Sequence, residues 1–124
     1  MAKAQYIRFE TPEELAEKAL QLAQGAHLKG KLRVGTNEVT KSSERSEAKL
    51  VIMAEDVDPP EILIHIPMLC EEKRIPYLYV QKKQRLGQAV GLNKQAASVA
   101  IVEPGEGNSP LFEEIVRAIP GLKK

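Results

Sequence analysis

Tryptophan is absent from this 124-residue chain, and other aromatic residues are scarce, with three tyrosines and two phenylalanines. A platform of aromatic rings on which single-stranded nucleic acid stacks is therefore not expected. The single cysteine, Cys70, cannot form an internal disulfide or a cysteine metal cluster, which is typical of a reducing compartment. No apolar run approaches the roughly 20 residues that span a bilayer, and the first residues lack the apolar stretch of a signal peptide. We therefore expect a cytoplasmic protein that does not associate with membranes.

Two common phosphate-binding motifs are also missing. The chain contains neither a Walker A loop nor a Gly-x-Gly-x-x-Gly turn, so mononucleotides and dinucleotides lack their usual cradle. The composition itself is ordinary, with 43% hydrophobic and 28% charged residues, and it indicates a globular protein. Residues 1–124 are expected to form one domain, because two smaller ones would each bury too little apolar surface. We expect this domain to be a monomer.

The net charge of +1 conceals a sorted distribution of charge along the chain. Residues 27–50 carry six Lys or Arg against three Glu. Residues 51–61 carry four acids and no base, whereas residues 81–94 carry four bases and no acid. Two basic segments therefore flank an acidic one, a pattern that favours a local binding site for an anion.

Helices and strands alternate in the pattern of apolar residues. Helices are expected to start at Thr11, Thr36 and Asp58 as N-caps, with Pro67 kinking or dividing the third. The pattern predicts helices over 11–23, 37–46, 59–72, 83–90 and 111–119, and strands over 32–34, 50–54, 76–80 and 98–102. This order predicts an α/β fold, a three-layer α/β/α sandwich around a small four-stranded mixed, mostly parallel sheet.

Catalytic candidates are few. His65 and Cys70 could form a nucleophile pair, but five residues of helix place them roughly 140° apart around the axis. Glu55, Asp56, Asp58 and Glu61 (the last two also explained as a helix cap) could bind a hard cation. His27 lies in no pattern of metal ligands. We therefore expect no catalytic residue, metal or cofactor, and keep a small metal-dependent hydrolase that uses the acidic 55–61 segment as the alternative function.

The segment from Gly35 to Lys41 is more informative. A glycine-opened helix start presents unpaired backbone N–H groups and the positive end of the helix dipole, which favours a phosphate. Asn37 adds a donor and an acceptor, and Glu38 adds an acceptor only. A carboxylate beside a polyanion is unfavourable unless it accepts hydrogen bonds from base amino or imino groups. The segment is thus suited to nucleobase edges, although Glu38 and Lys41 also suit an ordinary solvated helix start.

A second candidate follows the fourth predicted helix, at Gly91–Lys94. Leu92 could cover an unstacked base while Lys94 meets the backbone, which is a usual way of reading bulged RNA. Alternatively, Leu92 closes the helix by packing inward.

These segments belong to a set of six that occur in order between about residues 6 and 103. They are GTNEVTK at 35–41, AEDVDPPEI at 54–62, HIPMLCEE at 65–72, IPY at 75–77, LG at 86–87 and AASVAI at 96–101. Together they resemble the kink-turn RNA-binding ribosomal protein L7Ae family. The resemblance implies a non-enzymatic protein that nucleates the assembly of ribonucleoprotein particles. Its implied partners are large-subunit ribosomal RNA, box C/D and H/ACA guide RNAs, the RNA of ribonuclease P, and the proteins of those particles.

The resemblance also assigns residues to the contact with RNA. It implies that Asn37, Glu38 and Lys41 contact the tandem sheared G·A pairs of a kink-turn. It implies that Asp58, Ile62 and Lys83 line the pocket of an extruded nucleotide and that residues 92–94 form the loop over the bulge. The complete implied site consists of Gly35, Thr36, Asn37, Glu38, Lys41, Asp58, Ile62, Lys83, Leu92, Asn93 and Lys94.

Four positions depart from the family pattern. Val34 replaces a basic residue, which removes one expected phosphate contact. Ser46 and Arg74 stand where glycine is common, and Gln95 stands where proline often follows the recognition loop. The departures bear on affinity and on the choice of kink-turn sequence more than on RNA binding itself.

Overall fold

The computed structural model describes residues 6–123. Its four strands form one sheet in the order β1-β4-β2-β3. The strands are β1 (Lys31–Val34), β2 (Leu50–Ala54), β3 (Tyr77–Val80) and β4 (Ser98–Glu103). The helices are α1 (Glu13–Lys29), α2 (Thr36–Glu44), the 3₁₀ turn η1 (Pro60–Ile62), α3 (His65–Lys73), α4 (Lys83–Ala89) and α5 (Ser109–Leu122). The alternation of helices and strands predicted from sequence is confirmed.

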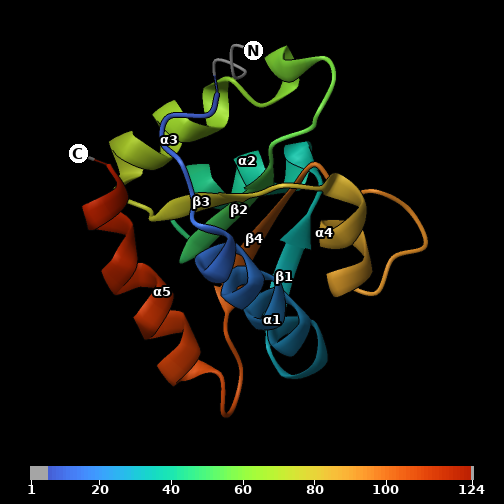
Figure 1. The fold of residues 1–124 in the computed structure, drawn as a ribbon, viewed down its shortest axis with the longest axis vertical. Helices are drawn as coiled ribbons and strands as arrows, with labels where there is room; N and C mark the ends of the chain where they lie inside the picture. The colour runs from blue at the N-terminus through green and yellow to red at the C-terminus, as the bar shows by residue number, and fades with distance from the viewer. Residues whose placement is uncertain (1–5, 124) are drawn as a thin grey trace.

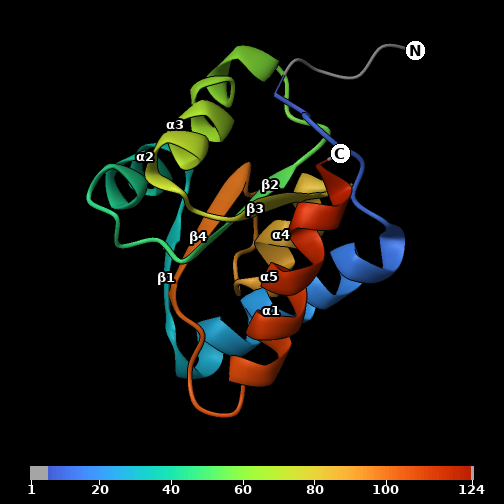
Figure 2. The same ribbon diagram turned by 90° about the vertical axis from the view of Figure 1, so that its left-hand side faces the viewer.

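The helices form two layers, one on each face of the sheet. Figure 2 shows α2 and α3 on one face and α1, α4 and α5 on the other, and Figure 1 shows α1 and α4 beside each other on that second face. The three-layer α/β/α sandwich with a mixed sheet is therefore confirmed. Within residues 6–123, no helix combines the length and apolarity needed to cross a bilayer.

The expectation of a mostly parallel sheet is wrong. β2 pairs with β3 in parallel, but β4 lies between β1 and β2 and is antiparallel to both. The physical reason is the short connection before β4. The seven residues of α4 rise only about 10 Å at 1.5 Å per residue, so the helix does not return the chain to the opposite edge of the sheet. β4 therefore starts at the same end of the sheet at which β3 finishes, and it runs antiparallel to β3.

The core lies on both faces of the central strand. All five residues of β2 are buried, as a strand covered on both faces requires. The apolar side of α1 packs against the second face through Leu15, Ala19, Leu22 and Ala23, as predicted from their helical spacing. All four residues of β3 are buried as well, although β3 lies at an edge of the sheet.

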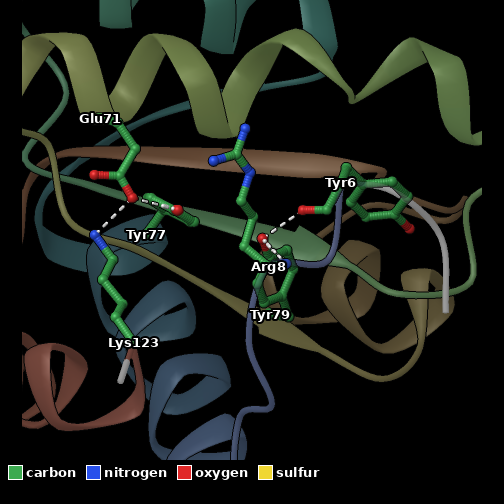
Figure 3. A network of polar contacts seen from close by, with 6 residues as sticks. All are labelled: Tyr6, Arg8, Glu71, Tyr77, Tyr79 and Lys123. Carbon is green, nitrogen blue, oxygen red and sulfur yellow. Dashed lines mark hydrogen bonds and ion pairs between the residues drawn. The ribbon is translucent and has the colours of Figure 1, made fainter.

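A network of tyrosine hydroxyls explains how the edge strand is covered (Figure 3). The Tyr79 hydroxyl donates to the carbonyl of Tyr6 at 2.5 Å and accepts the backbone N–H of Arg8 at 3.0 Å. The backbone N–H of Tyr79 donates to Thr11 Oγ1 at 3.2 Å. The segment before α1 thus hydrogen-bonds to β3, and it satisfies hydrogen-bonding groups that an edge strand would otherwise leave open.

The predicted N-caps are wrong at all three helices. The hydroxyl of Thr11 accepts from Tyr79 instead of capping α1, which starts at Glu13. Thr36 is already the first residue of α2, and Gly35 occupies the cap position. The predicted helix over 59–72 is split into η1 and α3, with no side-chain cap from Asp58. The division falls at 63–64 and not at Pro67, which lies in the first turn of α3, where its missing N–H removes no helical hydrogen bond.

Candidate nucleic-acid interface

The strand directions bring the predicted site segments to one edge of the sheet, which is the edge formed by the carboxyl ends of β1, β2 and β3. Because β1, β2 and β3 run the same way and β4 runs against them, three strands end where β4 begins. The start of α2, the 55–62 segment, the start of α4 and the loop before β4 therefore follow or precede strands at this edge. Figure 1 shows α4 and the loop before β4 beside each other at the right of the molecule.

Backbone hydrogen bonds tie the four segments together. They run from the Gly35 N–H to the Ser98 carbonyl at 3.0 Å, from the Ala54 N–H to the Ala97 carbonyl at 3.0 Å, from the Glu55 N–H to the Val80 carbonyl at 2.8 Å, and from the Ala96 N–H to the Lys83 carbonyl at 3.1 Å. Each bond joins two segments that are distant in sequence. The edge is therefore a continuous hydrogen-bonded surface and not a set of independent loops.

Gly35 sets the direction of α2. Its φ of +94° and ψ of 151° lie in a region that is essentially restricted to glycine, and a Cβ at this position would meet no atom within 4 Å. Conformation, not packing, therefore requires the glycine. The first helical bond runs from the Val39 N–H to the Gly35 carbonyl at 2.9 Å, so the amides of residues 36–38 precede the helical hydrogen-bond ladder.

Asn37, Glu38 and Lys41 are all exposed on the first turns of α2. Lys41 Nζ lies 3.8 Å from Glu38 Oε2, with more than half of each side chain exposed. An ion pair in this setting is weak, so both groups can exchange it for contacts with a ligand at little cost. One turn along, Thr40 Oγ1 lies 2.8 Å from His65 Nε2 and joins α2 to α3.

The 55–62 segment places two predicted residues at the surface. Asp58 is exposed, and the side chain of Ile62 is 41% exposed. Lys83 is half-buried as the first residue of α4, and its backbone N–H donates to Asp56 Oδ1 at 2.8 Å. Sequence reasoning missed this role of Asp56, because the two residues lie 27 positions apart. The Asp56 bond holds the start of α4 beside the 55–62 segment.

The loop after α4 folds back onto the helix. A Cβ at Gly87 would lie 2.0 Å from the carbonyl oxygen of Lys94, so the close approach of the loop depends on glycine. Leu92 is half-buried and packs against the core, whereas Asn93 and Lys94 are exposed. The inward packing that the sequence left open as an alternative for Leu92 is therefore observed.

The structure separates the proposed nucleophile pair. Cys70 is fully buried, and burial raises the pKa of its thiol to about 12. His65 is exposed and contacts Thr40 instead. In the part of the chain from 6 to 123, no three His, Cys, Asp or Glu side chains converge as a metal site would require.

The departures from the family pattern have distinct structural settings. Ser46 and Arg74 have φ values of 58° and 60°, and among residues 6–123 they are the only non-glycine residues with positive φ. Each follows the end of a helix, which explains why glycine suits these positions. Val34 is half-buried and packs against the core, and Gln95 is exposed in the loop before β4.

Comparisons with known proteins place this edge in a family context. Residues 17–109 match the ribosomal protein L7Ae/L30e/S12e/Gadd45 family, and this range contains every predicted site residue. The fold is similar to that of the solved Giardia lamblia 15.5kD RNA binding protein. The two share 30% sequence identity with a TM-score of 0.87, over 97% of this chain and 98% of the other. The matched range exceeds half of the chain, and the chain therefore belongs to the ribosomal protein L7Ae/L30e/S12e/Gadd45 family.

Proposed function

We propose that this chain binds RNA at the described edge of the sheet and recognises kink-turn motifs without catalysing a reaction. The observation that carries the proposal is the set of backbone hydrogen bonds that joins the Gly35 helix start, the beginning of the 55–62 segment and the end of the loop before β4 where β1, β2 and β3 end. Membership of the family and the similarity to a solved RNA-binding protein support RNA as the ligand.

Asn37 and Glu38 are proposed to read base edges. Both are exposed on the first turn of α2, beside backbone amides that favour a phosphate. A carboxylate cannot bind a phosphate, but it accepts hydrogen bonds from the amino and imino groups that sheared G·A pairs expose. Lys41, whose Nζ lies 3.8 Å from Glu38 Oε2, is proposed to exchange that contact for one with the same G·A pairs.

The other residues are proposed to hold the bulge of the kink-turn. Ile62 offers an exposed apolar surface for an extruded nucleotide, and the exposed Asp58 belongs to the same 55–62 segment, which Asp56 holds against the backbone of Lys83. The 92–94 loop covers the bulge. Bases that leave the stack are recognised in this way by many RNA-binding proteins.

The proposed mechanism is selection of a bent RNA. Bending brings phosphates together, so free RNA populates the kinked form only in part, and a protein that binds only that form shifts the equilibrium toward it. The proposed targets are large-subunit ribosomal RNA, box C/D and H/ACA guide RNAs and ribonuclease P RNA, where binding nucleates assembly with partner proteins. A cytoplasmic, monomeric, single-domain protein remains our proposal for its state outside the particle.

Gel-shift titration of matched variants tests the proposal. Glu38→Ala and Asn37→Ala should each weaken binding to a kink-turn with sheared G·A pairs by about 1–3 kcal/mol, because each leaves base-edge groups unpaired. Glu44→Ala is the control, since Glu44 is an exposed glutamate at the far end of the same helix. Lys83→Ala should weaken binding to every RNA and reduce the salt dependence by about one unit of slope. Equal affinities of Glu38→Ala and the parent would contradict the base-edge role.

A further inference from the structure

A polar hollow lies between α4 and the loop that follows it, the region at the right of Figure 1. Its volume of about 730 Å³ falls within the range of about 300–1,000 Å³ that is typical of small-ligand sites. The lining residues are Gln84, Gln88, Leu92, Asn93, Lys94 and Gln95. Gln84 and Gln88 have no role in the proposed kink-turn contacts.

The walls of the hollow are held in place by backbone contacts. The Leu92 N–H donates to the Gly87 carbonyl at 2.9 Å, and the Ala96 N–H donates to the Lys83 carbonyl at 3.1 Å. Between these bonds, the absent side chain of Gly87 lets the Lys94 carbonyl approach the helix. The hollow therefore exists before a ligand arrives, which lowers the entropic cost of binding.

The chemistry of the lining suits one class of occupant. Four of the six side chains are amides, one is the cation of Lys94 and one is apolar, and none is a carboxylate. An adjacent groove between α1 and α4 differs, because there the guanidinium of Arg85 is paired with the carboxylate of Glu17 at 2.5 and 2.9 Å. The hollow thus combines a positive charge with neutral donors and acceptors, as a nucleotide requires.

We infer that this hollow holds an unpaired nucleotide of the bound RNA, whose base edge is read by the amides of Gln84 and Gln88. Residues four apart on a helix lie on one face, so both amides can reach the same base. A glutamine amide pairs best with the amino group and N7 of adenine, and the Lys94 ammonium meets the adjoining phosphate. The inference rests on the proposed function, because the bulge of a kink-turn supplies the unpaired nucleotide.

A panel of kink-turn RNAs tests the inference. Each bulge nucleotide is made adenosine, uridine or abasic in turn, and affinities are measured for the parent and for the double variant Gln84→Ala, Gln88→Ala. At one bulge position, the parent should prefer adenosine over an abasic site by about 5- to 150-fold, the range of one bidentate base contact. The double variant should lose that preference and still bind the abasic kink-turn as the parent does. Gln21→Ala, an exposed glutamine on α1 outside the hollow, is the matched control.

Two outcomes separate this inference from the proposed function. If the double variant keeps the parent's nucleotide preference at every bulge position, or if the parent has none, the inference is overturned while kink-turn binding stands. If the parent does not distinguish a kink-turn from a duplex, the proposed function fails first and the inference falls with it. A loss of the adenosine preference by Gln21→Ala equal to that of the double variant would also overturn the role of the hollow.

Discussion

Replacing Gly87 by alanine should displace the recognition loop. The added Cβ would lie 2.0 Å from the Lys94 carbonyl oxygen and 3.2 Å from the Ala96 nitrogen, both of which are backbone atoms that cannot rotate away. Ordinary contact begins near 3.4 Å, so the carbonyl must retreat by more than 1 Å. Overpacking of this kind typically costs about 1–3 kcal/mol. We expect Gly87→Ala to lower the free energy of unfolding by that amount and to weaken RNA binding.

Chemical denaturation and RNA titration of the folded variant measure the two effects separately. Gly121→Ala is the control, because a Cβ there meets nothing within 4 Å and the residue lies in α5, away from the loop. Alanine is favoured over glycine in helices by about 1 kcal/mol, so this control should not be destabilised. Unchanged stability and unchanged affinity of Gly87→Ala would refute the claim that the glycine seats the loop.

Three further predictions concern backbone strain and acid. Gly35→Ala should cost about 1–3 kcal/mol in chemical denaturation and weaken RNA binding, because its φ of +94° excludes a side chain; a variant as stable as the parent would contradict this. Ser46→Gly and Arg74→Gly should each raise the free energy of unfolding in chemical denaturation by about 1 kcal/mol, since both residues have positive φ. The Tyr77 hydroxyl donates to Glu71 and lowers the pKa of that carboxyl from 4.5. The ionised Glu71 therefore stabilises the folded state fully above pH 4.5, and this contribution is lost as the pH falls through the lowered pKa. The melting temperature, measured from pH 7 to pH 3, should therefore fall less steeply for Glu71→Gln than for the parent.

The sequence predicted the elements better than their ends or directions. Buried β-branched runs and helical spacing indicate strands and helices locally, which is why β2 and α1 were found with their core residues. The predicted N-caps were wrong because the hydrogen-bond partners of these side chains can lie far away in the chain, as Tyr79 does from Thr11. The direction of β4 failed because it depends on how far α4 carries the chain, a property of the packed structure.

The candidate site divides in the same way. The sequence of 35–41 predicted an exposed helix start with an acceptor among donors, and the structure places these groups at the surface. That the start of α2, the start of the 55–62 segment and the loop before β4 lie at the same end of the sheet follows from the strand directions, which periodicity does not reveal. Gln84 and Gln88 were missed because the hollow that they line forms only when the loop folds back onto Gly87.

The most direct test of the central claim compares two RNAs of equal length and composition, one able to form a kink-turn and one a plain duplex. A protein that reads base edges of the folded form should prefer the kink-turn by at least about 10³-fold at physiological salt, the lower end of specific over non-specific binding. Equal affinity for the two RNAs would contradict the account.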